Sequence, residues 1–293
     1  MTPGWELEMG RITAIYRYPV KSMGGEALQR VTLGQGGLPG DRAWAVRDEV
    51  RGGIRGAKKI PALMTCSARY AKTPGDTGSS TAEIQLPDGT QIATSDADIN
   101  ERISAAVSHE VSLWPLLPED AREHYARGAP DHEDMEQELR EMFGRNPDEP
   151  LPDLGKFPPE LFQYESPPGT YFDAYPLLVV SQQSLDEMSR RAEGSLFDVR
   201  RFRPNIVVDL PEVDAPFPEA VLEGKQLRVG GVVLQTTIAC PRCVMTTHGF
   251  EDLPKDPRIM RALVKNAEGN LGLYAEVSEP GEISVGDELV VVG

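Results

Sequence analysis

Cysteine is scarce in this chain: only Cys66, Cys240 and Cys243 occur among its 293 residues. An odd and low count does not support the disulfide framework of a small secreted domain. A cysteine set for an iron–sulfur cluster is also lacking. The Cys-x-x-Cys pair at 240–243 therefore indicates metal or redox chemistry, whereas Cys66 follows an apolar stretch and is expected to be a small buried residue.

Basic residues are outnumbered, since 30 Lys and Arg stand against 46 Asp and Glu and give a formal net charge of −16. A protein that binds nucleic acid needs a basic face to displace counterions from the phosphate backbone, so we expect no nucleic-acid partner. A local basic pocket for one small phosphate remains compatible with this balance.

Long apolar runs are also lacking. The longest candidate, at 177–180, is far shorter than the roughly 20 residues that cross a bilayer. The start of the chain carries Glu6, Glu8 and Arg11 where a secretory signal would have a basic start and an apolar stretch. We therefore expect a cytoplasmic protein without a membrane span.

Short strand patterns dominate what is present. Apolar residues alternate over 10–20, and Asp88-Gly89 between two short apolar runs predicts a hairpin at 82–94. Further strands are expected at 43–46, 111–116, 175–180, 205–209, 229–238, 275–277 and 288–292, and helices at 98–107, 131–143, 184–192 and 256–269. Many short strands with few helices favour a mostly β, α+β chain built from β-barrels over alternating βαβ units.

Two of these helices carry start signals. The pattern from Ser184 to Glu187 is a capping box, so the third helix is expected to begin there. Asp256 followed by Pro257 predicts the start of the last helix.

Residues 118–170 differ from the rest in composition. An acidic helical stretch at 131–143 precedes a loop that is dense in proline, with seven prolines between 147 and 168. We interpret this segment as an insert or connector. A solvated linker and a lid over a substrate are both compatible with its composition.

The segment Cys240-Pro241-Arg242-Cys243 admits four interpretations. A thioredoxin-like pair needs its first cysteine at a helix N-terminus, and the residues after Cys243 are poor helix starters. A zinc site would use Cys240, Cys243 and His248 but lacks a fourth ligand. In the third interpretation, the two cysteines are a purely structural pair. In the fourth, Cys243 alone is a reactive or metal-binding thiolate. Arg242 favours that thiolate over the thiol, and a thiolate suits a soft metal.

Further basic and polar residues lie at expected strand ends and turns, where binding groups usually occur. Lys21 and Ser22 follow the first strand, and Arg42 lies where a turn meets the next. Arg203 and Asn205 end an arginine-rich run before another strand. Arginine forks bind phosphate bidentately and an asparagine amide pairs with a heterocycle edge. The alternative is a solvated basic turn.

Four motifs follow one another along the chain: Tyr-Pro-Val-Lys-Ser at 18–22, Gly-Asp-Arg at 40–42, Phe-Arg-Pro-Asn at 202–205 and Cys-x-Arg-Cys-x-x-Thr-Thr at 240–247. With them the chain resembles the MOSC proteins that have an N-terminal MOSC β-barrel domain, a group that includes the mitochondrial amidoxime reducing components and bacterial relatives. The resemblance implies a MOSC N-terminal β-barrel-like domain at 10–117, the insert or connector at 118–170 and a MOSC β-barrel core domain at 171–293.

The resemblance also implies a molybdenum cofactor, Mo-molybdopterin, which a purified sample can lack. Cys243 would ligate the molybdenum and is thus the predicted catalytic and metal-binding residue. The predicted cofactor-binding residues are Lys21, Ser22, Arg42, Ala174, Tyr175, Arg203, Asn205, Pro241, Arg242 and Cys243. Ala174 and Tyr175 fall where the family touches the cofactor, although their side chains depart from its pattern.

The implied activity is that of a molybdenum-dependent reductase of N-hydroxylated, or other N- or S-oxygenated, small molecules. Because the chain lacks cysteines for an iron–sulfur cluster, electrons would come from a separate partner of flavin, cytochrome b5-like or ferredoxin type. After Thr246-Thr247 the chain departs from the family with His248, for which we consider a role as proton donor beside that of an ordinary loop histidine.

Two alternatives to the enzyme remain open. In the first, the protein carries sulfur or molybdenum cofactor, with Cys243 as a persulfide or thiolate. In the second, it is a structural or binding protein, and Lys21, Arg42 and Arg203 do not converge around Cys243.

Overall fold

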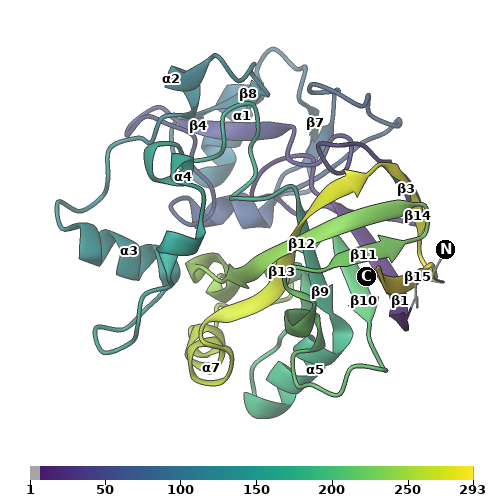
Figure 1. The fold of residues 1–293 in the computed structure, drawn as a ribbon. Helices are drawn as coiled ribbons and strands as arrows, with labels where there is room; N and C mark the ends of the chain where they lie inside the picture. The colour runs from purple at the N-terminus through teal and green to yellow at the C-terminus, as the bar shows by residue number, and fades with distance from the viewer. Residues whose placement is uncertain (1–6, 293) are drawn as a thin grey trace.

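A closed barrel of seven strands is built from the largest sheet of the computed structural model, which describes residues 7–292 (Figure 1). The pairing order is β10, β9, β13, β12, β11, β15 and β1, and β1 closes the barrel by pairing with β10. The bounds are β1 Leu7–Arg17, β9 Leu177–Ser181, β10 Ile206–Asp209, β11 Gln226–Val229, β12 Val232–Pro241, β13 Asn270–Glu279 and β15 Glu288–Val292. The expected mostly β architecture with a barrel is confirmed.

The barrel takes one of its seven strands from the start of the chain. β1 pairs with β10 on one side and with β15 on the other, both antiparallel. Beyond the barrel, β2 (Glu26–Leu28) pairs with β1, and β3 (Arg30–Leu33) pairs with β14 (Gly281–Ser284). The region expected to form the first domain therefore contributes directly to the barrel of the second.

β9 shows why a continuous apolar run forms a strand here. Leu177 and Val179 point into the barrel core, while Leu178 and Val180 pack outside it. The outer face is covered by α5 (Gln182–Arg191) and α7 (Arg258–Ala267). Both faces are thus buried, so the strand carries no alternation of apolar and polar residues.

The remaining N-terminal strands form a second, smaller body above the barrel in Figure 1. β4 (Trp44–Asp48) pairs with β8 (Val111–Pro115), and β5 (Ser67–Arg69), β6 (Glu83–Gln85) and β7 (Gln91–Ala93) form a three-stranded sheet. The predicted hairpin at 82–94 is confirmed as β6–β7. η1 (Pro61–Thr65) and α1 (Ile99–Val107) complete this body.

The core of this N-terminal body includes three residues that follow Cys243 in the sequence. Met245, Phe250 and Leu253 pack into it together with Val46 and Ile84. The segment that follows Cys243 is thereby fixed between the barrel and the N-terminal strands.

Residues 118–170 are folded and attached to the rest of the protein. They contain α2 (Arg122–Tyr125), α3 (Met135–Phe143), η2 (Leu154–Lys156) and α4 (Glu160–Gln163). In Figure 1, α3 and α4 lie to the left of the barrel strands. Tyr125 and Tyr171 are fully buried with Ala45 and Ile54 at the root of this segment.

The helix starts differ in part from expectation. α5 begins one turn before the predicted capping box, because the Ser181 side chain accepts the backbone N–H of Ser184 at 3.0 Å. The Ser184 hydroxyl instead donates to the buried Glu219 of η3 (Pro218–Leu222). Asp256 accepts the N–H of Arg258 at 3.0 Å, and α7 begins at Arg258 with Pro257 as its N-cap, one residue later than predicted. No helix between residues 7 and 292 has the length and apolar character to cross a membrane.

Candidate active site

A cavity of about 650 Å³ lies where the barrel, the N-terminal strands and the 118–170 segment meet. All ten predicted cofactor-binding residues line it: Lys21, Ser22, Arg42, Ala174, Tyr175, Arg203, Asn205, Pro241, Arg242 and Cys243. Lys21, Arg42 and Arg203 therefore converge on the cavity that contains Cys243. This counts against the alternative of a structural protein with scattered basic residues.

Three of the lining residues have strained backbone. Ser22 (φ 72°), Arg42 (φ 47°) and Arg203 (φ 55°) lie in the left-handed region, as do only three other non-glycine residues in the described part of the chain. Each follows a strand, a turn or the short helix α6 (Val199–Phe202). Such conformations cost energy and concentrate at functional sites, where the surrounding structure enforces them.

Cys243 lies at the N-terminus of one 3₁₀ turn, η4 (Val244–Thr247), and is partly exposed. Its carbonyl accepts the Thr246 hydroxyl at 3.1 Å. Cys240, the first cysteine of the pair, lies in β12 and is buried. The short helical turn was not expected, but it follows the second cysteine, so the arrangement is not that of a thioredoxin-like pair. Cys66 is buried in the N-terminal core as predicted, and burial raises the pKa of its thiol to about 11.

Arg242 is held beside Cys243 by two contacts. Its Nη1 donates to the Cys240 sulfur at 3.0 Å and its Nη2 to the Phe202 carbonyl at 2.7 Å. Burial raises the pKa of Cys240, against the effect of the Arg242 charge. Nε of Arg242 is buried and has no hydrogen-bond partner.

Arg203, which follows the Phe202 whose carbonyl binds Arg242, repeats this pattern. Its Nη1 donates to the Met23 carbonyl, and the guanidinium lies 4.1 Å from the centre of the Tyr18 ring. Burial, together with the charge of Arg42, lowers the pKa of Arg203 to about 10. Its Nη2 is buried without a partner. A buried donor left unpaired costs about 1–3 kcal/mol, so Arg203 and Arg242 both favour a ligand that brings acceptor oxygens.

The side-chain amide of Asn205 is hydrogen-bonded to other groups of the protein. Its Oδ1 accepts the Leu178 N–H at 3.1 Å, and its Nδ2 donates to Asp41 at 3.1 Å and to the Tyr16 carbonyl at 3.4 Å. The amide is thus engaged on both sides, which differs from the expected free edge for a heterocycle. Asp41 also pairs with Arg42, so Asn205 helps to orient that arginine.

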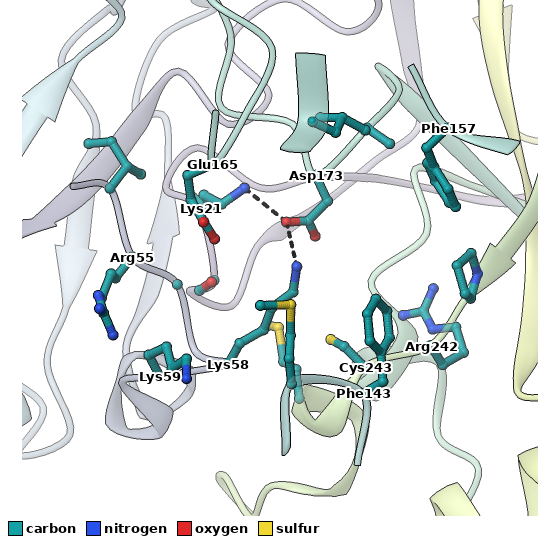
Figure 2. A pocket seen from close by; sticks show the side chains of 18 of the residues that line it. Lys21, Arg55, Lys58, Lys59, Phe143, Phe157, Glu165, Asp173, Arg242 and Cys243 are labelled. Carbon is teal, nitrogen blue, oxygen red and sulfur yellow. Dashed lines mark hydrogen bonds and ion pairs between the residues drawn. The ribbon is translucent and has the colours of Figure 1, made fainter. Parts of the chain in front are cut away.

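Lys21, Lys58 and Asp173 form an ion cluster inside the cavity (Figure 2). Lys21 Nζ lies 3.0 Å and Lys58 Nζ 3.3 Å from the same Asp173 oxygen, and Lys21 also donates to the Tyr171 carbonyl at 2.8 Å. Burial opposes the charge on Asp173, but Lys21 and Lys58 hold its pKa well below the usual range. Burial likewise opposes the charge on Lys58, while Asp173 and Cys243 raise its pKa above the usual range.

The cavity is strongly basic in a protein of net charge −16. Four of its cations were predicted, and sequence reasoning missed Arg55, Lys58, Lys59 and Arg127. Among the described residues, these eight cations face three lining acids, Glu138, Glu165 and Asp173. The run Arg-Gly-Ala-Lys-Lys at 55–59 was the available signal, and Asp173 adjoins the predicted Ala174. The local basic pocket allowed by the composition is therefore present.

Ser22 positions the loop that carries three of the missed cations. Its hydroxyl accepts the Ala57 N–H at 2.9 Å. A Cβ on Gly56 would lie only 2.5 Å from the same hydroxyl, so glycine is required for this approach. The contact places Arg55, Lys58 and Lys59 beside the cavity.

His248 does not line this cavity. It is buried, its Nε2 donates to the Ala57 carbonyl at 3.0 Å, and burial lowers the pKa of the ring. It faces a separate pocket behind η4. The considered proton-donor role is thus not supported, and the described residues contain no cluster of three or more metal-ligating His, Cys, Asp or Glu side chains, which removes the zinc interpretation.

Comparison with known families matches two consecutive parts of the chain. Residues 9–120 match the MOSC N-terminal beta barrel domain and residues 167–290 match the MOSC domain. The chain therefore belongs to the MOSC-domain proteins with an N-terminal MOSC β-barrel domain.

Within that class, the chain is similar to amidoxime reducing components. Mitochondrial amidoxime reducing component 2 of Bos taurus is 25% identical over 311 residues, which cover 96% of this chain and 82% of that protein. Mitochondrial amidoxime-reducing component 1 of Mus musculus is 32% identical over 137 residues, or 42% of this chain and 38% of that protein. Among solved structures, the YUAD protein from Bacillus subtilis aligns over 98% of both chains with 14% identity and a TM-score of 0.45.

Proposed function

We propose that this protein is a molybdenum-cofactor-dependent reductase of N-hydroxylated, or related N- or S-oxygenated, small molecules. One observation carries the proposal: Cys243 shares a basic cavity with two buried guanidinium groups that each have an unpaired donor. The similarity to amidoxime reducing components supports the reductive direction of the chemistry.

The residues present fit such a cofactor. The Cys243 thiolate is a soft ligand for molybdenum. Nη2 of Arg203 and Nε of Arg242 would donate to anionic oxygens of the pterin phosphate or its neighbours, with Lys21 and Arg42 adding positive charge. When bound, the cofactor supplies two-electron redox chemistry, and the protein supplies position and charge.

Lys58 and Asp173 are the charged side chains available to orient a substrate. The raised pKa of Lys58 keeps Nζ protonated at neutral pH, so it serves as a hydrogen-bond donor and not as a base. The lowered pKa of Asp173 keeps it an acceptor. Together they would align the oxygen of an N–OH group near Cys243.

Electrons would come from a separate donor protein of flavin, cytochrome b5-like or ferredoxin type. The relatives' names describe them as components, which supports a partner. The cytoplasmic location expected from the sequence stays a prediction that cell fractionation checks.

The test is expression in a host that makes molybdenum cofactor, with wild type beside Cys243→Ser and Cys66→Ser. Cys66 is the matched control, since it is a cysteine outside the cavity. We expect near-stoichiometric molybdenum and pterin, and amidoxime reduction with a chemical electron donor, in wild type and Cys66→Ser. Molybdenum and activity should both be lost in Cys243→Ser, and full activity in that variant would refute the mechanism.

The carrier alternative gives a different outcome of the same experiment. The Cys243 sulfur is partly exposed to a basic cavity, which also suits a persulfide anion. Protein that contains labile sulfur dependent on Cys243, but neither molybdenum nor pterin, would support sulfur delivery in place of reduction.

A further inference from the structure

One wall of the cavity is apolar, in contrast to its basic floor. Six side chains of the 118–170 segment form this apolar wall: Leu139, Met142, Phe143, Leu154, Phe157 and Leu161. Met135 and Phe162 also line the cavity and are strongly exposed, 62% and 58%, at its rim. The basic residues come mainly from the barrel and the N-terminal strands, so the two halves of the cavity belong to different parts of the chain.

The apolar wall is not used to build a core. All six side chains are only partly buried, and none packs into the four hydrophobic cores of the described residues. On α3, Leu139, Met142 and Phe143 follow the i, i+3, i+4 spacing of one helix face. An amphipathic helix normally turns such a face to a protein core, whereas α3 turns it to the cavity.

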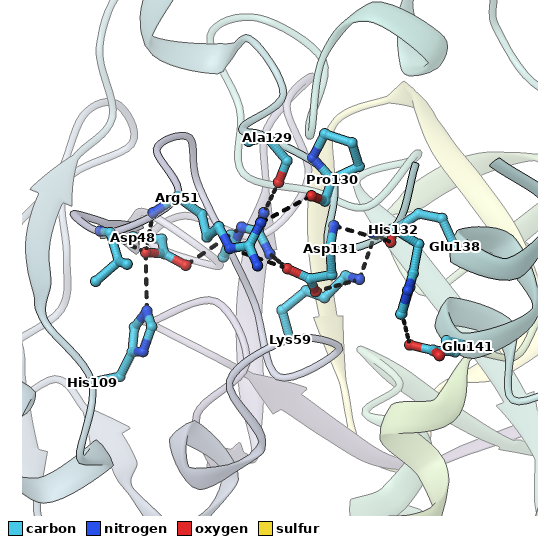
Figure 3. Close-up of polar contacts among 12 residues, drawn as sticks. Asp48, Arg51, Lys59, His109, Ala129, Pro130, Asp131, His132, Glu138 and Glu141 are labelled. Carbon is cyan, nitrogen blue, oxygen red and sulfur yellow. Dashed lines mark hydrogen bonds and ion pairs between the residues drawn. The ribbon is translucent and has the colours of Figure 1, made fainter. Parts of the chain in front are cut away.

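The N-terminal end of α3 is attached to the N-terminal strands by ion pairs (Figure 3). Lys59 Nζ lies 2.7 Å from Asp131 and 2.5 Å from the buried Glu138, and Arg55 lies 3.2 Å from Asp131. Glu138 also accepts the backbone N–H of Asp131 and of His132, each at 3.2 Å. The helix therefore starts at a fixed place.

The other end of the apolar wall is attached to the barrel side. Arg145 Nη1 donates to the Met260 sulfur of α7 at 2.6 Å, and Arg261 of α7 donates to the Gly144 carbonyl. Phe157 packs edge-on against Tyr274 of β13 with ring centres 6.5 Å apart. Phe143, Cys243 and Arg242 all line the cavity (Figure 2), so the apolar wall and the predicted reaction centre face the same space.

We infer that the apolar wall is the subsite for the hydrocarbon body of the substrate. Anionic groups find partners on the basic floor, whereas the wall offers only dispersion and hydrophobic contact. The substrate is then an N-hydroxylated molecule with an uncharged aromatic or alkyl body on the wall and its N–OH group toward Cys243. For an amidoxime, the N–O bond breaks, two electrons from the donor protein and two protons are taken up, and an amidine and water are released. The inference rests on the proposed function for the polar end of the substrate.

The test compares two amidoximes that differ only in their body, benzamidoxime with a phenyl group and acetamidoxime with a methyl group. Cofactor-loaded wild type, Leu139→Gln, Leu161→Gln and the control Leu151→Gln are assayed for kcat/KM and for binding by calorimetry. Leu151 is a partly buried leucine of the same segment that does not line the cavity. Thermal unfolding of each variant checks that it is folded.

We expect wild type to prefer benzamidoxime by about tenfold or more, as a hydrophobic pocket allows. Leu139→Gln and Leu161→Gln should lose about tenfold for benzamidoxime and less than about twofold for acetamidoxime, with Leu151→Gln unchanged. Equal use of both compounds by wild type, or equal losses for both in the variants, would overturn the inference. If neither compound is reduced but benzamidoxime still binds in a Leu139- and Leu161-dependent manner, the proposed reduction fails and the apolar subsite stands.

Discussion

At the scale of single residues, Asp173 supplies a negative charge inside a basic cavity that is expected to bind an anionic group. Its carboxylate pairs with Lys21 and Lys58, the cations nearest to it, while Arg203 and Arg242 keep unpaired donors. Other lining cations are paired as well: Arg42 with Asp41, Lys59 with Asp131 and Glu138, and Arg127 with Glu165. An incoming phosphate or pterin oxygen would find unpaired donors at Arg203 and Arg242.

Replacement of Asp173 by Asn should destabilise the protein at neutral pH by about 1–2 kcal/mol, because the buried Lys21 and the partly buried Lys58 lose a partner that is itself in part exposed to the cavity. The lowered pKa of Asp173 means that its stabilisation is present above the unfolded pKa of about 3.9. The difference between wild type and Asp173→Asn should therefore shrink as the pH falls below that value and through the lower folded-state pKa. Urea unfolding from pH 7 to pH 3 measures it.

Added inorganic phosphate should stabilise Asp173→Asn more than wild type, since it replaces the missing anion. A matched control is Asp98→Asn, which breaks the exposed pair with Arg102 on α1. Equal phosphate effects on all three proteins would contradict an anion site at Lys21 and Lys58.

The sequence predicted the members of the site better than their contacts. Cys243, Arg203 and Arg242 belong to short motifs of the family that the chain resembles, and all three line the cavity. Lys58 and Asp173 were missed, because the contact between them joins segments 115 residues apart. No local pattern reports such a pairing. His248 was considered for its residue type, and its burial against Ala57 depends on tertiary packing.

At the scale of elements, strands were predicted well where the local sequence carries a strand or turn signal. The β6–β7 hairpin follows from Asp88-Gly89, and β9 follows from its unbroken apolar run. The start of α5 was wrong because Ser181 and Ser184 are both competent caps. Both hydroxyls donate to Glu219, which lies 35 residues from Ser184, and it is Ser181 that accepts the Ser184 N–H.

The 118–170 segment shows what composition leaves open. Its acidic helix and its prolines fit a linker or a lid equally well. In the structure, Asp131 and Glu138 attach α3 to Lys59 through ion pairs. The segment is therefore a wall of the cavity and not a solvated linker.

Loss of these ion pairs should make local opening of residues 131–163 easier without unfolding the rest of the protein. In Asp131→Asn/Glu138→Gln, we expect the opening free energy of residues 131–163 to fall by about 1–2 kcal/mol, because Lys59 loses the buried Glu138 and both Lys59 and Arg55 lose the more exposed Asp131. Hydrogen exchange should accelerate there, while α5 and the barrel strands keep their protection. Unchanged exchange in 131–163 would show that the ion pairs do not hold the segment.

At the scale of the whole molecule, the two matched domains share structure in both directions. β1 is a strand of the barrel, and Met245, Phe250 and Leu253 complete the N-terminal core. Neither half retains all its partners without the other. Sequence motifs mark the halves as separate, because they do not report which strand closes a barrel.

The intact chain should accordingly unfold in one cooperative transition. A fragment of residues 121–293 should fail to form the closed barrel, because β10 and β15 lose the strand between them. Circular dichroism and calorimetry of the fragment, alone and co-expressed with residues 7–120, test this. A fragment that melts like the whole protein would contradict it.

The apolar wall lies on a different stretch of chain from Cys243, Arg203 and Lys21, and it meets them only across the cavity. Natural variation can therefore alter the wall while the residues of the opposite face stay constant. Under the proposed function, substitutions in the wall can change the substrate range without changing the redox chemistry. New substrate preferences would then evolve through substitutions in residues 118–170, while Cys243, Arg203 and Lys21 are preserved.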